Sequence, residues 1–416
     1  MMVLAGFPTF YMELAIGQFA GQTPALLYNR MCPLFAGLGT AMVIISAFTG
    51  IYTIWYLPGV YTFWQTLSEQ FCLGNTVETT EITVHCYDDV IAAECAENNK
   101  TYFNGSCISG ASEEIKTESD VYNSSRELPA QQYLNRRVFG LSSGIEEIGG
   151  LRWELTLSLL LAWILVSWQR FRKKCCGTCH LRSFPAFFAY PYVVTKIPLP
   201  PVWAVLFFFM LFLLGIDGQI VTVDVVITAI TDRWPKLRLW KYQILVVASV
   251  CCIGFGLGII LTTAGGPYIL TIVDKYAAGW PLIVACLVEM VMVMWVYGIK
   301  RFVTDIGMML GKTKPGYLRY LGFPVSRFHY ITWLAVTPLL LTAVFLYTVI
   351  GMKRTTYGQY YEFPLWAEGL GWLMALASVG WIPIIAVSKL IQCYRRKLPL
   401  KLLVIPTSDW KNSTKC

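Results

Sequence analysis

Residues 201–229 read PVWAVLFFFMLFLLGIDGQIVTVDVVITA, an apolar run in which only Asp217 and Asp224 carry a charge. A transmembrane α-helix needs about 20 predominantly apolar residues, so this run is long enough for a tilted helix. It is also continuous, whereas the strands of a membrane β-barrel alternate between two faces over about 10 residues. Seven further stretches have the same character: 1–19, 37–66, 151–169, 242–263, 278–299, 330–351 and 366–392. The sequence predicts an all-α multi-pass membrane protein with about eight transmembrane helices.

The composition excludes a soluble protein of this length. Of the 416 residues, 56% are hydrophobic and 14% are charged, and the mean hydropathy is +0.54. Ordinary globular chains carry about 25% charged residues, so the apolar surface here must face a lipid bilayer. A net charge of +8 could indicate nucleic acid, but the basic residues lie in short clusters beside the apolar runs. No nucleic-acid partner is therefore expected.

The charge is divided unevenly along the chain. Residues 68–150 hold fourteen of the 25 acidic residues and five of the 33 basic residues, so this segment has a net charge of −9 and the rest of the chain +17. Four cysteines and three glycan-acceptor sequons lie in the same segment: Cys72, Cys86, Cys95 and Cys107, and Asn99, Asn104 and Asn123. Because glycans and disulfides form outside the cytosol, we expect an extracellular loop here.

Short basic clusters accompany the apolar stretches, at 170–174, 233–241, 300–327 and 395–401. Cytoplasmic loops of membrane proteins carry an excess of Lys and Arg. Each of these clusters is therefore expected on the cytoplasmic side.

Two motifs have competing interpretations. Cys176-Gly-Thr-Cys179-His180 matches the pattern for covalent c-type haem attachment, but it lies in a basic stretch beside the membrane with no haem pocket near it. Zinc binding with Cys175, palmitoylation and no function at all remain open for it. Gly254-Phe-Gly256-Leu-Gly258 looks like a nucleotide loop, yet it lies inside an apolar stretch without a preceding strand. Small residues that let two helices approach closely are the better account.

Four acidic residues lie within the apolar stretches: Glu13, Asp217, Asp224 and Glu289. A charge in the hydrocarbon region is costly, so each is a functional candidate; the structural alternative is a buried hydrogen-bonding group that holds two helices together. Asp217 and Asp224 share one helical face. In Leu214-Gly-Ile-Asp217-Gly-Gln, the carboxylate stands beside two glycines that expose backbone carbonyls. This combination suits a hard cation such as sodium.

A set of short motifs is spread over most of the chain outside residues 68–150. They are Phe10-Tyr-Met-Glu-Leu-Ala-Ile-Gly-Gln18, Cys32-Pro33, Gly37-Leu-Gly39, Pro198-Leu-Pro-Pro-Val-Trp-Ala-Val-Leu-Phe-Phe-Phe-Met, Leu214-Gly-Ile-Asp217, Gly265-Gly266 with Asp274, and Trp295-Val-Tyr-Gly-Ile-Lys-Arg-Phe-Val-Thr-Asp305-Ile. The first resembles the second span of the sodium- and chloride-dependent neurotransmitter transporter family, and the others are similar to later blocks of that family.

The family has twelve spans in an inverted-repeat fold, in which broken helices one and six hold substrate and sodium near the membrane midplane. By this resemblance the chain opens within span two, and its stretches correspond to spans two, three, four and eight to twelve. Spans one and five to seven have no counterpart, so the implied fold is a partial inverted-repeat sodium symporter. The expected division is 1–67, spans two and three; 68–150, the glycosylated extracellular loop; 151–170, span four; 171–200, a junction with an outer-loop remnant; 201–392, spans eight to twelve; and 393–416, a basic cytoplasmic tail.

The resemblance implies half of a transport site. The carbonyl of Leu214 and the carboxylate of Asp217 match the family's second sodium site, and they are the metal ligands that the resemblance implies for this chain. In the family a serine that supplies a hydroxyl usually follows, and Gly218 replaces it here. The substrate-contacting tyrosine of span three aligns with Thr53, and Tyr52 precedes it. On span eight, Gly218 and Gln219 complete the substrate-binding set.

Two outer features also follow from the resemblance. Asp274 matches the acid of the outer gate, whose arginine partner belongs to the first span. Cys72 and Cys86 are the favoured pair for the outer-loop disulfide, although four cysteines allow three connectivities.

The implied function is sodium-coupled symport of a small amino acid, neurotransmitter or amine by alternating access, with sodium and chloride as co-transported ions, no other cofactor and no enzymatic activity. Two alternatives stay open: a truncated, non-transporting form that associates with full-length relatives, and an incomplete gene model. Self-association into a homo-oligomer is also compatible with the family. The isolated chain is expected not to transport, because the first sodium site draws on absent spans.

The location follows from the same reasoning. The resemblance implies a multi-pass protein of the plasma membrane. Removing three consecutive spans reverses the side from which span eight starts, which conflicts with the cytoplasmic placement of the basic cluster at 233–241. Mixed topology and retention in the endoplasmic reticulum are therefore expected of the truncated form.

Overall fold

The computed structural model describes residues 2–53, 101–103, 106–108, 139–172, 200–310, 325, 327–357, 361–397, 399–407 and 410. Several predicted features lie outside these residues: the pair Cys72 and Cys86, the sequons at Asn99, Asn104 and Asn123, and the motif ending at His180. The backbone of Thr53 and Leu214 is described, but their side chains are not.

The N-terminal part of the chain contains three helices in sequence. A π-helical turn, η1 (Met2–Gly6), leads into α1 (Phe7–Ala20), and α2 (Pro24–Met31) and α3 (Ala36–Thr53) follow, with a 3₁₀ turn η2 (Pro33–Phe35) between the last two. Proline stands at the start of α1 and α2, where its missing N–H is not needed. Helix α1 ends at Gly21, whose φ of 57° is the left-handed conformation that glycine adopts without strain.

Long helices dominate the middle of the chain. They are α8 (Trp153–Arg172), α10 (Pro200–Arg233), η5 (Pro235–Arg238), α11 (Trp240–Leu261), α12 (Gly266–Val273), η6 (Asp274–Gly279), α13 (Trp280–Val291), η7 (Met292–Gly298) and α14 (Ile299–Leu310). The segments η6 and η7 are π-helical turns within one helical run. Such turns often mark functional positions in helices.

The C-terminal part is also helical. Its elements are α15 (Arg327–Ile331), η9 (Thr332–Val336), α16 (Thr337–Ile350), α17 (Leu365–Val379), α18 (Trp381–Arg395) and η10 (Leu400–Leu403). The described strands form two short antiparallel hairpins: β1 (Thr101–Phe103) with β2 (Ser106–Ile108), and β3 (Thr356–Tyr357) with β4 (Tyr361–Glu362). The predicted all-α class is confirmed.

Among the described residues, four helical segments are long and apolar enough to cross a membrane: Pro33–Tyr52, Trp240–Leu261, Gly266–Met309 and Phe328–Ile350. The pair α17 and α18 makes a fifth if it counts as one span bent by 43°. The other predicted stretches are helical as well, as η1 with α1, α8 and α10. The apolar part of α8, Leu155–Trp168, is shorter than a full span. The chain is thus a multi-pass membrane protein.

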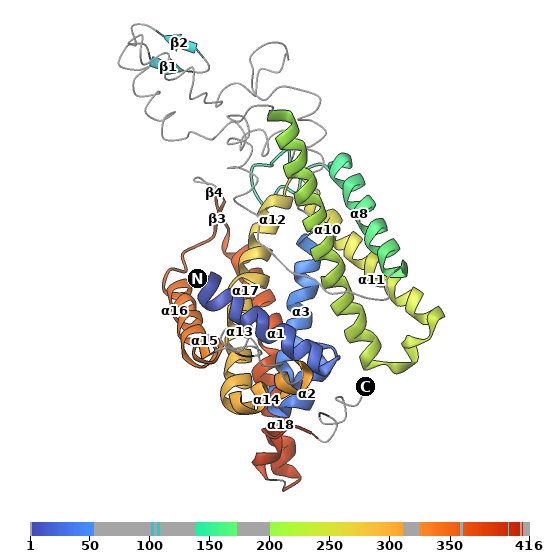
Figure 1. Ribbon diagram of the computed structural model, residues 1–416. Coiled ribbons are helices and arrows are strands. Elements are labelled where there is room, and N and C mark those ends of the chain that lie inside the picture. The colour runs from blue at the N-terminus through green and yellow to red at the C-terminus, as the bar shows by residue number, and fades with distance from the viewer. Residues whose placement is uncertain are drawn as a thin grey trace.

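Helix α3 lies at the centre of the bundle and packs against α2, α10, α11, α17 and α18 (Figure 1). Two glycines near its start make this possible. A Cβ on Gly37 would lie 2.3 Å from the carbonyl oxygen of Trp381, and one on Gly39 would lie 2.2 Å from that of Pro24. The Gly37-Leu-Gly39 motif therefore serves close backbone packing of α3 against α18 and α2.

The packing of α8 on α11 confirms the interpretation of the glycine motif in residues 254–258. A Cβ on Gly254 would lie 2.3 Å from the ring of Trp163, and one on Gly258 would lie 3.2 Å from Leu159. Gly256 has open space instead. The first and third glycines admit the neighbouring helix, and the motif binds no nucleotide phosphate in this setting.

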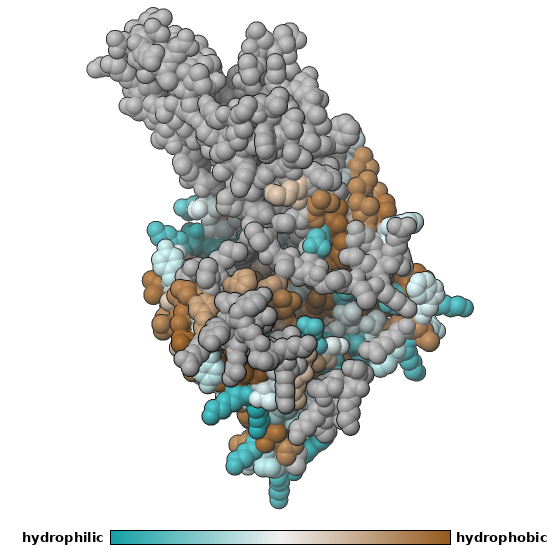
Figure 2. Space-filling model, viewed as in Figure 1, coloured by the Kyte–Doolittle hydropathy of each residue, from teal (hydrophilic) through white to brown (hydrophobic). Residues whose placement is uncertain are grey.

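Apolar side chains cover the flanks of the bundle. Figure 2 shows them over α16 on one side and near α8 and α10 on the other. On α16, Leu339 is 72% exposed and Ile350 is 84% exposed, and on α8 Leu161 and Ile164 are more than half exposed. Because soluble proteins do not expose contiguous apolar faces of this size, these flanks are the surfaces that face lipid.

Candidate functional site

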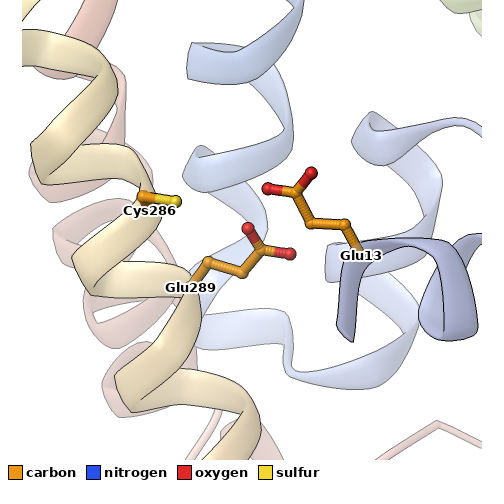
Figure 3. Close-up of side chains that lie close together, drawn as sticks. All are labelled: Glu13, Cys286 and Glu289. Atoms are coloured by element: carbon orange, nitrogen blue, oxygen red, sulfur yellow. The ribbon is translucent and has the colours of Figure 1, made fainter. Parts of the chain in front are cut away.

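Two acidic residues that lie 276 positions apart in the sequence meet inside the bundle. Glu289 on α13 is fully buried, and its carboxylate points toward that of Glu13 on α1 (Figure 3). Tyr28 on α2 donates a hydrogen bond of 2.6 Å to Oε1 of Glu289. Cys286 stands one helical turn before Glu289 on α13, and the ligand atoms of Glu13, Cys286 and Glu289 all lie within 4.8 Å of one another. Three helices therefore contribute to one polar cluster.

The arrangement of this cluster has a simple electrostatic consequence. Two carboxylates that face each other repel, and here one of them, Glu289, is shielded from water, which strengthens the repulsion. Their close approach favours binding of a positive charge between them, either a proton or a metal ion. The pair therefore forms a place between α1 and α13 that can take a cation, and Glu289 also joins α13 to α2 through its hydrogen bond with Tyr28.

The predicted sodium ligands lie on α10. Leu214 and Asp217 are three residues apart, so they share one helical face. The Asp217 side chain is exposed, whereas the next two residues, Gly218 and Gln219, are buried. Asp217 is thus turned away from the described neighbours of α10. Asp224, two turns later, is half-buried.

Gln219 connects α10 to α3. Its side chain is 1% exposed, and Nε2 donates a 2.7 Å hydrogen bond to the backbone carbonyl of Gly50. A Cβ on Gly50 would lie 3.2 Å from Oγ1 of Thr222 on α10. The two predicted walls of the substrate site, on spans three and eight, are therefore in direct contact at these residues.

Tyr52 lies two residues beyond Gly50, in an apolar cluster with Leu261, Leu270 and Ala278. Its side chain is 7% exposed. The structure thus brings Tyr52 beside α11, α12 and η6, and Gln219 beside Gly50. The role of Tyr52, Thr53, Gly218 and Gln219 in binding a substrate stays a prediction.

Asp274, the predicted outer-gate acid, is half-buried at the start of the π-helical segment η6. The next residue, Lys275, donates hydrogen bonds through Nζ to the carbonyl of Lys353 at 3.0 Å and to Oγ1 of Thr355 at 2.7 Å. The backbone N–H of Thr355 donates in turn to Oε1 of Glu368 on α17, at 2.8 Å. This polar network ties η6 to the segment that follows α16.

The C-terminal tail contacts two helical elements, α2 and η7. Trp410 Nε1 donates a 3.1 Å hydrogen bond to the hydroxyl of Tyr297, and that hydroxyl donates to Asp305 on α14. Thr407 N–H donates to the carbonyl of Arg30 at 2.9 Å. The tail is therefore attached to both α2 and η7, a contact that the prediction of a basic tail over 393–416 did not include.

Sequence reasoning singled out Glu13 and Glu289 but missed Tyr28 and Trp410. Both are aromatic residues with a polar hydrogen, which usually find a partner when buried. Tyr28 lies between the apolar stretches 1–19 and 37–66, and Trp410 lies in the polar tail beyond residue 392, where an aromatic residue suits a membrane interface equally well. The sequence alone therefore offered no signal that separates a buried hydrogen-bonding role from an interfacial one.

Comparison with known proteins places this chain in a family. Residues 1–172 and 183–393 match the model of the sodium:neurotransmitter symporter family. The chain is 26% identical to the sodium- and chloride-dependent neutral and basic amino acid transporter B(0+) of Homo sapiens over 529 residues, which covers 94% of this chain and 79% of that protein. It is also 26% identical to the sodium- and chloride-dependent taurine transporter of Bos taurus, over 93% of this chain and 77% of the relative.

A third relative shows the same pattern. The sodium- and chloride-dependent GABA transporter 2 of Homo sapiens is 26% identical over 500 residues, covering 91% of this chain and 77% of that protein. These alignments are longer than the 416 residues of the chain, so the relatives carry residues that have no counterpart here. The family match covers most of the chain on both sides of residues 173–182. This chain belongs to the sodium:neurotransmitter symporter family.

Proposed function

We propose that this chain belongs to a sodium-coupled symporter for a small amino acid, neurotransmitter or amine. In this proposal α3 and α10, which correspond to spans three and eight of the family, supply half of the transport site. The observation that carries the proposal is the arrangement on α10. Leu214 and Asp217 share a face of the helix, and Gln219 next to them is hydrogen-bonded to Gly50 on α3. A carboxylate with a neighbouring backbone carbonyl is suited to sodium, a hard cation that prefers oxygen ligands.

The names of the relatives support the substrate class. They are transporters of neutral and basic amino acids, taurine and GABA, and each name includes both sodium and chloride. The common features of these cargoes are small size and an amino group. We therefore propose chloride as a second co-transported ion and a zwitterionic or cationic small molecule as the cargo.

The proposed mechanism is alternating access. The contact of α10 with α3 forms one wall of the substrate path, and the exposed side chain of Asp217 on α10 is available for a ligand. In the family fold the remaining ligands come from spans one and six. Gly218 offers no hydroxyl, so the second sodium site of this chain has one oxygen ligand fewer and a lower expected sodium affinity than a site with serine.

A second candidate function is regulation of full-length relatives. It is favoured by the exposure of Glu13 and Asp217, two acids within membrane helices that need a polar partner, and by the length of the alignments relative to this chain. In this form the chain associates with a complete transporter and traps or inhibits it. It is then a membrane protein retained in the endoplasmic reticulum, whereas the complete symporter belongs to the plasma membrane.

The two candidates are tested in a cell without endogenous amino acid uptake. The experiment has three arms. The chain is expressed alone, the chain is co-expressed with a full-length relative, and a longer transcript that also encodes the proposed missing spans near residues 173–182 is expressed by itself. Sodium-dependent uptake from the restored transcript supports the symporter. Reduced uptake by the co-expressed relative, with co-purification of the two chains, supports the regulatory form. If the longer transcript gives no sodium-dependent uptake and the co-expressed relative keeps its full uptake, both candidate functions are contradicted.

A further inference from the structure

Cys286 has no part in the proposed transport function, yet its thiol faces two carboxylates. It precedes Glu289 by three residues on α13, so the two side chains emerge from the same face of that helix. Glu13 approaches from α1 on the opposite side of the gap (Figure 3). The ligand atoms of these three residues lie within 4.8 Å of one another. Sulfur and oxygen ligands from two helices therefore converge on one point.

Glu289 is held in place on one side only. Its Oε1 accepts the hydrogen bond from Tyr28. Its Oε2 is buried and receives no hydrogen bond from a donor among the described residues. The Glu289 side chain is 1% exposed and directed at Glu13. A buried carboxylate oxygen without a donor is costly unless a positive charge satisfies it.

We propose that Glu13, Cys286 and Glu289 form a binding site for a thiophilic divalent cation, Zn²⁺ or Cd²⁺, that bridges α1 and α13. Zinc binds Cys thiolate and Glu carboxylate in tetrahedral sites, and an open site uses three protein ligands with water in the fourth position. On binding, the Cys286 thiol releases its proton and the sulfur coordinates the metal as thiolate. The ion places positive charge between the two carboxylates and supplies a partner for Oε2 of Glu289.

The geometry requires only a small adjustment. Zinc-to-ligand distances of about 2.0–2.3 Å in a tetrahedral site place the ligand atoms about 3.4–3.6 Å apart. The separations here extend to 4.8 Å, so rotation of the Glu13 and Cys286 side chains closes the site without movement of the helices. Glu13 is exposed among the described residues, which leaves a path for the ion and for a water ligand.

The ligand chemistry distinguishes this site from the sodium site on α10. Sodium prefers oxygen ligands alone, whereas thiolate selects zinc, cadmium and other soft ions. The inference also stands whether or not the chain transports, because it concerns α1 and α13 and not α10. The alternative occupant of the gap is a proton shared between the two carboxyl groups.

The experiment uses the full chain purified in detergent, titrated with Cd²⁺ and followed by the ultraviolet charge-transfer absorbance of a cadmium–thiolate bond. Cys175, Cys176 and Cys179 are replaced by serine in every sample, because that cluster could bind cadmium itself. In this background one Cd²⁺ per chain is expected, and Zn²⁺ should displace it. Cys286→Ser should abolish the band, whereas Cys252→Ser, which changes an exposed cysteine on α11, should leave it unchanged. Tyr28→Phe removes the group that orients Glu289 and should weaken binding about 10- to 100-fold.

A second measurement covers variants that fold poorly. Zn²⁺ should protect Cys286 of the unmutated chain from alkylation by a maleimide, and Glu13→Gln should remove this protection while the elution profile stays monodisperse. An unchanged charge-transfer band in Cys286→Ser, or no protection of Cys286 at saturating Zn²⁺, would overturn the proposal. The latter result would assign the gap to a shared proton.

Discussion

Replacement of Gly39 by alanine tests the packing at the centre of the bundle. Gly39 lies where α3 passes α2, and a Cβ there would meet three backbone atoms: the carbonyl oxygen of Pro24 at 2.2 Å, its carbon at 2.6 Å and the Cα of Ala25 at 2.7 Å. Real Cβ atoms do not approach backbone atoms this closely. Because no flexible side chain can move aside, α2 and α3 must separate.

The magnitude follows from two opposing effects. Overpacking in a well-packed interior costs about 1–3 kcal/mol, and backbone obstruction on three sides places Gly39→Ala at the upper end. The better helix propensity of alanine returns about 0.5–1 kcal/mol. The net loss is therefore about 2–2.5 kcal/mol in the free energy of unfolding. The matched control is Gly17→Ala on α1, where a Cβ meets nothing within 4 Å; this variant keeps the propensity gain without the clash.

The assay is thermal unfolding of the purified chain in one detergent, followed by the loss of the monodisperse elution peak after heating. The apparent melting temperature should fall for Gly39→Ala and stay equal or rise for Gly17→Ala. If the two variants shift in the same direction by the same amount, the close contact of α3 with α2 is wrong.

Three further predictions address the sodium site, a buried thiol and the tail. In a form that contains the missing spans, Asp217→Asn should weaken the sodium dependence of uptake much more than Asp224→Asn, and equal effects would count against the assigned ligand. Burial raises the pKa of the Cys32 thiol to about 11, and its side chain is 0% exposed, so in the folded chain at about pH 8 peptide mapping should find Cys32 alkylated far more slowly than the exposed Cys252; equal rates for the two cysteines would contradict this. Trp410→Ala should free the tail from Tyr297 and accelerate tryptic cleavage at Lys401 in η10, while an unchanged cleavage rate would show that the contact of Trp410 with Tyr297 does not hold the tail in place.

The sequence predicted the helices of this protein well where apolar runs are long and end abruptly. The stretch 242–263 became α11, Trp240–Leu261, and 330–351 became the run from α15 to α16. The predicted stretch 278–299 was too short at both ends, because the helical run begins at Gly266, shortly after α11 ends, and continues to Met309. The π-helical turns η6 and η7 carry no composition signal, since they depend on how neighbouring helices pack.

The contacts within the candidate site could not be predicted from the sequence. Glu13 and Glu289 stood out because an acid in an apolar stretch is costly, but nothing in either stretch shows that they face each other. That meeting depends on the tertiary arrangement of α1 and α13. The same holds for Gln219 and Gly50, which are joined by a side-chain hydrogen bond across 169 residues.

The most direct test of the account is sodium-dependent uptake of a panel of labelled small amino acids by the chain as given, in cells without endogenous uptake. The proposed half-site on α10 has Asp217 and the carbonyl of Leu214 as its ligands, and the resemblance to the family implies that the other ligands come from spans one, six and seven. The account predicts uptake equal to that of mock-transfected cells, with sodium-dependent uptake appearing once the missing spans are restored. Sodium-dependent uptake by the isolated chain above the mock level would contradict it.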